Sequence, residues 1–264
     1  LARKPSLPAC GGVGEMNYEA WLKTCRIHWM RGIDKKIDAA KKMLLDFFST
    51  VEKPYCAISG GKDSLVSLDL AMSVAPGTFD VCWGDEDFNM PGTREQISAI
   101  EHHYAIKVTR IRVRHGAREF RDMFGCYPAC ENPHPVDFEA DTGKEVTAHF
   151  GWDGVILGLR SEESRQRRYA MTNPLRKLKG KDIWRVSPIP HWTYRDVWSY
   201  MVGMGLPVHK AYETMIEGGV DPSLARIGPF TAVRVWEYGA HENNRRFFPE
   251  EWNDFVRQNP FVPR

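Results

Sequence analysis

The stretch 55-YCAISGGKDSLVSLDLA-71 decides the fold of this chain. Residues 55–58 are an apolar run that is too short for a helix and is followed at once by Ser59 and two glycines. A run of this kind predicts a buried strand. Over residues 62–74 the apolar side chains recur at helical spacing, which predicts a helix. A tight, glycine-containing loop must therefore lead from the strand into the N-terminus of that helix.

The same alternation of strand and helix continues along the chain. Further strands are predicted at 79–83, 107–113, 154–158 and 182–186. Further helices are predicted at 21–32, 33–48, 93–104 and 193–204. Strands that alternate with helices indicate a parallel sheet covered by helices. We therefore expect an α/β fold, a doubly wound, Rossmann-like sheet of five parallel strands with helices on both faces.

The chain is expected to divide into three parts. Residues 1–50 form an N-terminal helical segment, and residues 51–205 form the α/β domain. Residues 206–264 are rich in Gly, Pro and aromatic residues and are expected to form an irregular C-terminal extension packed on that domain.

Composition excludes several classes of protein. The 264 residues carry 36 basic and 34 acidic side chains, a net charge of +2, so the overall charge does not itself indicate a nucleic-acid partner. No apolar run approaches the roughly 18–20 residues that cross a bilayer, and residues 1–16 contain no signal-peptide core. Six cysteines in a chain of this length do not indicate a disulfide framework. We expect a cytoplasmic protein with no membrane partner.

The loop at 59–64 has the chemistry of an anion site. The first N–H groups of a helix lack partners inside the helix, and the helix dipole adds positive charge there. Gly60 and Gly61 let the backbone approach a phosphate, Ser59 and Ser64 add hydroxyl donors, and Lys62 adds a cation. Asp63 would repel a phosphate, so it is interpreted as a helix cap or as a Mg²⁺ ligand. Both Lys62 and Asp63 are expected in an exposed loop.

The hexapeptide Ser59–Ser64, SGGKDS, is neither a Walker A loop nor a dinucleotide-binding G-x-G-x-x-G. It resembles the S-G-G-x-D-S loop of the adenine nucleotide α-hydrolase-like superfamily, the PP-loop ATP pyrophosphatases. Three further segments are similar to the phosphoadenosine phosphosulfate (PAPS) reductase branch of that superfamily. They are 84–93 with Asp85, 158-GLRSEESRQRR-168, and 188-PIPHWTYRDVW-198. The resemblance covers roughly residues 50–230.

The resemblance implies that ATP or PAPS lies across the carboxyl ends of the first and fourth strands. It assigns nucleotide binding to Ser59, Gly60, Gly61, Lys62, Asp63, Ser64, Asp85, Gly158, Arg160 and Arg165. Catalytic roles fall to Lys62, Asp63 and Arg160, with Mg²⁺ on Asp63 as the candidate metal.

Residues 160–185 form a basic segment with nine basic and three acidic side chains. Three interpretations stay open. The segment is a solvated loop, an anion clamp in which Arg160 and Arg165 bind phosphate or sulfate, or a contact to nucleic-acid phosphates.

The cysteines depart from the family pattern. PAPS reductases carry a redox cysteine near the C-terminus, whereas no cysteine follows Cys130 here. An iron–sulfur cluster is not expected, because Ile227-Gly228-Pro229 stands where related adenylylsulfate reductases carry a cysteine. Cys126, Cys130 and His134 are a candidate cluster whose role is structural, metal-binding or sulfur-handling.

The predicted function is that of a PP-loop ATP pyrophosphatase or PAPS reductase-like transferase, an enzyme of adenylyl or sulfur transfer that acts without the C-terminal redox cysteine. Its acceptor is undetermined among small molecules and nucleic-acid bases. Two alternatives stand beside it: a thioredoxin-dependent PAPS reductase, and a non-catalytic nucleotide-binding subunit of a nucleic-acid-modifying assembly. A homodimer or a complex subunit fits either class.

Overall fold

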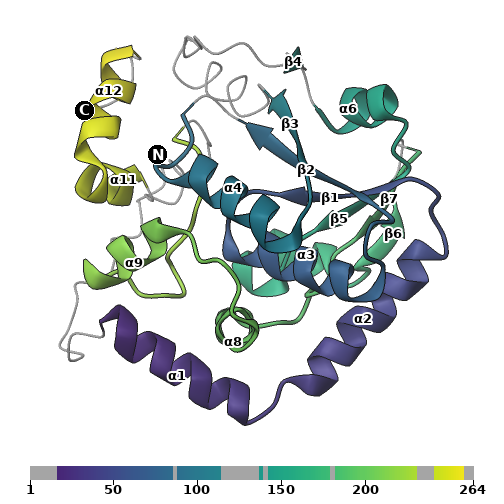
Figure 1. The fold of residues 1–264 in the computed structure, drawn as a ribbon, viewed down its shortest axis with the longest axis horizontal. Helices are drawn as coiled ribbons and strands as arrows, with labels where there is room; N and C mark the ends of the chain where they lie inside the picture. Colours follow the sequence, from purple (N-terminus) through teal and green to yellow (C-terminus); the bar gives the residue numbers. More distant parts are fainter. Residues whose placement is uncertain are drawn as a thin grey trace.

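A central sheet with helices on both sides forms the body of the molecule (Figure 1). The computed structural model describes residues 17–85, 88–113, 137–138, 142–178, 182–230 and 241–258. The strands there are β1 Pro54–Ile58, β2 Asp80–Asp85, β3 Val108–Val113, β4 Asp137–Phe138, β5 Gly154–Leu157, β6 Leu175–Lys177 and β7 Trp184–Val186. The α-helices are α1 Tyr18–Met30, α2 Asp34–Phe48, α3 Lys62–Val74, α4 Thr93–Tyr104, α6 Thr142–Phe150, α7 Arg165–Ala170, α8 Tyr194–Met204, α9 Lys210–Glu217, α11 His241–Phe247 and α12 Pro249–Gln258.

The strand order is β4-β3-β2-β1-β5-β7-β6. Every pair is parallel except β6 with β7, which is antiparallel. The predicted α/β class and the five predicted strands are confirmed. The described sheet has seven strands because β4 and β6 add two short ones. These two span two and three residues, too few for a hydrophobic pattern to indicate a strand.

The two faces of the sheet bury different clusters. On one face Cys56, Ile58 and Ile156 pack against side chains of α2, α3, α4 and α8. On the other face Cys82 and Ile111 pack against Val146 of α6 and against Trp152. Alternate residues of a strand point to opposite faces, so β1, β2 and β3 each supply both clusters.

The N-terminal and C-terminal helices pack around this body. Trp21 of α1 stacks on Tyr194 and meets Trp198 of α8 edge-on. Three helices, α9, α11 and α12, lie in the region expected to be irregular. Two of them are brief, and α12 joins the body through Trp252 and Phe255, which pack around Phe230. None of the described helices combines the length and the apolar character needed to cross a membrane.

The point where the chain changes direction lies between β1 and β5. From β1 the chain runs through α3 to β2 on one side, while β5 lies on the other side of β1. Doubly wound sheets bind ligands in the crevice at the carboxyl ends of such neighbouring strands. The loop 59–61 and the turn at Gly158 leave the sheet at this crevice.

Candidate functional site

The loop after β1 turns the chain sharply into α3. Gly60 has a φ of 75°, in the left-handed region that favours glycine. Gly61 is extended, with φ −85° and ψ 161°, and is the N-cap of α3, which begins at Lys62. The helix N-terminus therefore sits at the end of the central strand, as the sequence predicts.

Two serines hold the shape of this loop. The Ser59 N–H donates to Ser64 Oγ over 3.1 Å, and the Ser64 hydroxyl donates to the Gly61 carbonyl over 2.9 Å. The two hydroxyl oxygens lie 3.2 Å apart. The structure thus brings both predicted hydroxyls together, but it uses them to close the loop on itself.

The backbone of the loop keeps donors for an anion. Among the described residues, the N–H groups of Gly60, Asp63 and Ser64 donate to no acceptor. The Lys62 N–H donates to the Tyr212 hydroxyl over 3.0 Å. Unpaired N–H groups at a helix N-terminus, beside a lysine, are the donor set that binds phosphate.

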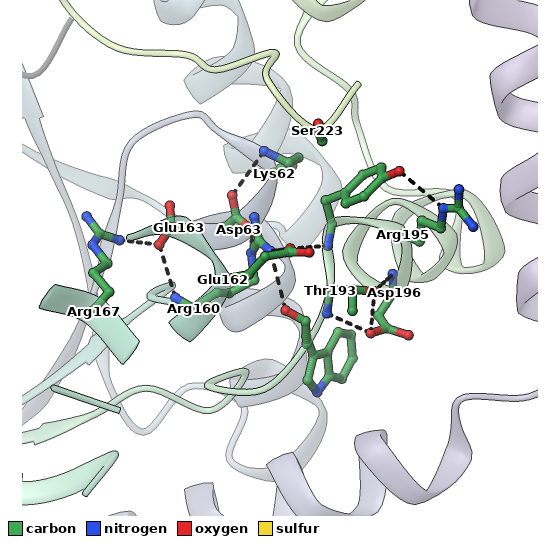
Figure 2. A network of polar contacts seen from close by, with 12 residues as sticks. Lys62, Asp63, Arg160, Glu162, Glu163, Arg167, Thr193, Arg195, Asp196 and Ser223 are labelled. Carbon is green, nitrogen blue, oxygen red and sulfur yellow. Dashed lines mark hydrogen bonds and ion pairs between the residues drawn. The ribbon is translucent and has the colours of Figure 1, made fainter. Parts of the chain in front are cut away.

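Lys62 and Asp63 form a buried ion pair beside these donors (Figure 2). Lys62 Nζ lies 3.2 Å from Asp63 Oδ2, and it donates to the Ala225 carbonyl over 3.4 Å. The prediction that both residues lie in an exposed loop is wrong: Lys62 is 3% exposed and the Asp63 side chain 17%. Burial opposes the charged form of each, but the opposite charges prevail, so the pKa of Lys62 is raised and that of Asp63 lowered.

Arg160, which follows β5, completes the charge network. Its Nε donates to Asp63 Oδ1, and its Nη1 contacts Glu162 Oε2 at 2.5 Å and donates to the Trp192 carbonyl over 3.3 Å. Burial acts against the charge of Arg160, and Asp63 reverses the effect, so the pKa of Arg160 is raised. Its Nη2 has no protein partner among the described residues. Arg160 therefore fixes Asp63 and still has N–H groups for an anion.

Gly158 lets β5 end directly against this loop. An ideal Cβ at residue 158 would lie 2.5 Å from Ser64 N and closer still to the carbonyl group of Asp63. Those atoms are backbone and have little freedom to move aside. Gly158 therefore lies directly against the loop, and its role in nucleotide binding stays a prediction.

Two further predicted residues lie on other elements, at the end of β2 and on α7. Asp85 is buried at the end of β2, where it accepts from Asn89 Nδ2 over 2.5 Å and lies 3.4 Å from Arg94 Nη2. Arg165 is exposed on α7. Cys126, Cys130 and His134 lie outside the described residues, and their interpretation stays a prediction.

The fit of a Mg²⁺ ion to Asp63 can be tested on its contacts. Both carboxylate oxygens already pair with cations, Oδ2 with Lys62 and Oδ1 with Arg160. Within the part of the chain that the structure describes, no group of three or more His, Cys, Asp or Glu side chains could hold a metal. A dedicated protein ligand set for Mg²⁺ does not fit here, and we derive no step through one.

Sequence reasoning missed the residues that cover the loop. The Tyr212 ring lies under Lys62 Nζ, 5.5 Å from the ring centroid, and Ala225 accepts from the same nitrogen. A Cβ at Gly61 would lie 3.8 Å from Ile227 Cβ. Nothing in the local sequence places Tyr212 on the loop, because the contact spans 150 residues.

His209 was also missed, and it lies beside Gly60. Its Nδ1 accepts from the Ala211 N–H over 3.1 Å, so Nε2 carries the proton and donates to Thr93 Oγ1 over 3.1 Å. The Thr93 hydroxyl in turn donates to the Met90 carbonyl over 2.7 Å. Burial lowers the pKa of His209 from 6.5 to about 4, which keeps the ring neutral in this network.

This buried histidine predicts a pH dependence of stability. Between pH 6.5 and about 4 the unfolded chain takes up a proton at residue 209 and the folded chain does not. The free energy of unfolding therefore falls on acidification, by about 2 kcal/mol between pH 7 and pH 5. His209→Asn keeps an acceptor for the Ala211 N–H. In urea titrations at several pH values we expect this variant to lose this part of the dependence of the free energy of unfolding on pH. The exposed His102→Asn is the control, and a His209→Asn slope equal to wild type contradicts the assignment.

The fold is that of a doubly wound α/β protein, and its switch point carries the helix N-terminus of α3 and the buried Lys62. A family model, the phosphoadenosine phosphosulfate reductase domain, matches residues 53–234, more than half of the sequence. The chain belongs to the PAPS reductase domain family.

The sequence matches between this chain and its relatives cover only part of each relative. An uncharacterized protein of Methanocaldococcus jannaschii is 28% identical over 222 residues, which is 80% of this chain and 43% of that protein. The PAPS reductase of Xanthomonas campestris pv. campestris is 41% identical over 93 residues, 35% of this chain and 34% of the reductase. The chain thus spans less than half the length of these relatives.

Solved structures share the fold. The PAPS reductase of Candida auris, in its phosphate complex, matches with a TM-score of 0.53 and 16% identity, over 83% of this chain and 98% of that one. The FMN adenylyltransferase of Candida glabrata, in complex with FAD and pyrophosphate, matches with a TM-score of 0.52 and 15% identity, over 74% and 67%. At these identities the likeness concerns the fold alone.

Proposed function

We propose that this chain binds an adenine nucleotide, ATP or PAPS, at the loop 59–64 and catalyses transfer of an adenylyl group or of sulfur. The observation that carries the proposal is the donor set at the N-terminus of α3. It combines unpaired N–H groups of Gly60 and Asp63 with a lysine that has used two of its three protons. Family membership supports an adenine nucleotide as the ligand.

In the adenylyl-transfer version, an acceptor oxygen attacks the α-phosphorus of ATP. The bond from that phosphorus to the β-bridging oxygen breaks, and pyrophosphate leaves with the electron pair. Lys62, Arg160 Nη2 and the N–H groups of α3 are placed to stabilise the charge that develops on the phosphates. A sulfur or nitrogen nucleophile then displaces AMP from the adenylylated acceptor. Asp63 holds Lys62 and Arg160 in position and contacts no reacting atom in this scheme.

The nature of the acceptor belongs to the proposal as well. Arg165 and Arg168 are exposed on α7, and Tyr169 beside them is 82% exposed. Arginines interleaved with an exposed aromatic ring bind phosphates and stack on bases. This surface favours an acceptor that carries phosphate groups, such as a nucleic acid.

A non-catalytic nucleotide-binding role is the second candidate, and one observation favours it. The Lys62 N–H and Nζ are already bonded to Tyr212 and Ala225 of the same chain. A nucleotide therefore reaches only the third proton of Nζ unless it displaces or shares these bonds. A binding subunit that closes around its ligand would show the same arrangement.

Nucleotide binding and turnover together test the proposal. We expect ATP or PAPS to bind in calorimetry, and Lys62→Met to weaken that binding at least tenfold, because a charged hydrogen bond is lost. Lys42→Met, an exposed lysine of α2, is the matched control. Pyrophosphate release from ATP is then measured with small-molecule and tRNA acceptors. Sulfite release from PAPS is measured with thioredoxin and is expected to be absent.

Each outcome separates the candidates. Binding without pyrophosphate or sulfite favours the non-catalytic role. Sulfite release supports a thioredoxin-dependent reductase and contradicts the argument from the missing cysteine. Equal nucleotide affinity in wild type and Lys62→Met removes the loop from the function.

A further inference from the structure

Arg185 of β7 has buried polar atoms without partners. Its Nε and Nη2 are buried and, among the described residues, have no hydrogen-bond acceptor. The Arg185 side chain as a whole is partly buried. Buried donors are nearly always satisfied in folded proteins. The missing partner of Arg185 is therefore an acceptor from outside the described chain.

A second arginine lies directly opposite on the neighbouring strand. Arg176 of β6 pairs with Arg185 in the antiparallel register. The bonds from Ser187 N to Pro174 O and from Leu178 N to Ile183 O flank the pair at 3.0 and 2.9 Å. Paired residues place their Cα atoms about 5.5 Å apart here, with side chains on one face, and like charges in this position repel.

A third arginine comes from α7. Burial lowers the pKa of Arg185, and the charges of Arg176 and Arg167 lower it further. Arg167 pairs with Glu163, but Glu163 also accepts from Arg226 over 3.1 Å. One carboxylate thus serves two arginines, and among the described residues neither Arg176 nor Arg185 pairs with a carboxylate.

The cluster is distinct from the loop 59–64. Arg185 is in register with Val155 of β5, and Val155 with Tyr55 of β1. These residues share the face on which Tyr55 packs with the α6 cluster, whereas α3 covers the opposite face. Arg176 and Arg185 therefore lie at the β6–β7 edge of the sheet, on the face away from α3, whereas Arg167 comes from α7.

We propose that Arg167, Arg176 and Arg185 form a second oxyanion site, which binds a phosphate or sulfate group. The planar guanidinium fork makes paired hydrogen bonds to such oxyanions, and a dianion supplies both the acceptors and the charge that the cluster lacks. The group belongs either to a free inorganic anion or to a second phosphate on a nucleotide. This site is additional to the nucleotide site proposed above.

The first test measures the binding of inorganic phosphate through the shift in unfolding temperature. Sodium chloride at equal ionic strength is the reference. A ligand that binds the folded state raises its stability with concentration. Lys62→Met serves as the background protein, so that phosphate at the loop contributes little. In that background we expect Arg185→Met to weaken phosphate binding at least tenfold. In chloride alone Arg185→Met should unfold at the same temperature or higher, because two buried donors without acceptors are gone.

Two further variants keep the test decisive. Arg176→Met, on the edge strand, should also weaken phosphate binding, and it carries the test if Arg185→Met fails to fold. Lys177→Met removes an exposed cation from the same strand but from its other face, and it should leave binding unchanged. Unchanged phosphate binding in Arg176→Met overturns the proposal, as does an equal loss in Lys177→Met.

The source of the anion is then resolved with nucleotides on the otherwise wild-type chain. If the second phosphate of one nucleotide reaches the cluster, adenosine 3′,5′-bisphosphate binds more tightly than AMP, and Arg185→Met removes that difference. If the site takes a free anion, both nucleotides bind alike and inorganic phosphate still stabilises the chain through Arg185. A failure of AMP to bind at all would count against the proposed nucleotide site and leave the phosphate measurement intact.

Discussion

Asp63→Asn is expected to lower the free energy of unfolding by about 3–5 kcal/mol, the range seen when one partner of a buried ion pair is removed. Asp63 is the carboxylate that contacts both Lys62 and Arg160. Lys62 and Arg160 are each about 3% exposed, so neither cation can recover its hydration when Asp63 is neutralised. Arg160 keeps Glu162, but among the described residues Lys62 keeps only the Ala225 carbonyl and the Tyr212 ring.

The measurement is urea unfolding of Asp63→Asn beside a matched control. Asp38→Asn removes the same charge from an exposed position of α2, and it should change stability by no more than about 0.5 kcal/mol. Lys62→Met with Asp63→Asn removes both charges of the pair and should recover part of the loss. Equal stabilities of Asp63→Asn and Asp38→Asn would show that the pair is not buried in solution.

Acid adds a second signature of the same carboxylate. Although burial favours the neutral form, Lys62 and Arg160 hold the pKa of Asp63 below its ordinary value of 3.8. The contribution of Asp63 to the free energy of unfolding is therefore complete above pH 3.8. It is lost as the pH falls through the lower pKa that Asp63 has in the folded chain. Asp63→Asn should lack this loss, whereas Asp38→Asn should keep it.

The sheet could be predicted because its strands and helices are patterned locally. Helix 62–74 was expected and observed with the same bounds, since its apolar spacing is continuous. In contrast, α7 has the sequence RQRRYA, which offers no apolar stripe, so the residues 165–170 were expected only as part of a basic segment. Its helix is set by Ser164, whose side chain accepts from the Arg167 N–H.

The site was predictable as far as the loop itself extends. The SGGKDS loop comes directly after β1, and Gly158 comes directly after β5. The parallel topology brings the ends of these two strands together. The cover of the loop was not predictable, because Tyr212 and Ala225 approach Lys62 across 150 and 163 residues. No local pattern signals contacts of that range, and the prediction of an exposed Lys62 failed for that reason.

The absence of an acidic partner for Arg185 among the described residues could not be predicted from the sequence either. The basic segment 160–185 was predicted as a whole, and a sum of charges cannot show which arginines find carboxylates. The structure separates them: Arg160 contacts Asp63 and Glu162, while Arg185 has buried donors without acceptors. Only the register between β6 and β7 places Arg176 against Arg185.

Gly158→Ala is the substitution expected to damage both the fold and the site. Its Cβ would lie 2.5 Å from Ser64 N, and a separation under 3.0 Å requires a shift of one partner. The atoms it meets are the peptide group between Asp63 and Ser64, so the shift must move the first turn of α3. We expect a loss of about 3 kcal/mol, the upper end for overpacking. We also expect ATP or PAPS to bind at least tenfold more weakly, because the N–H groups and Lys62 move with that turn.

Gly205→Ala separates this steric effect from backbone strain. Gly205 has a φ of 65° and no atom within 4 Å of an ideal Cβ, so alanine there is strained but has room. It should cost about 1 kcal/mol and leave nucleotide affinity unchanged. Calorimetry with ATP and PAPS and urea unfolding on both variants give the comparison. If Gly158→Ala loses no more than Gly205→Ala in stability and none in affinity, then β5 does not press on the loop. In that case the close approach of Gly158 would no longer explain why a glycine stands there.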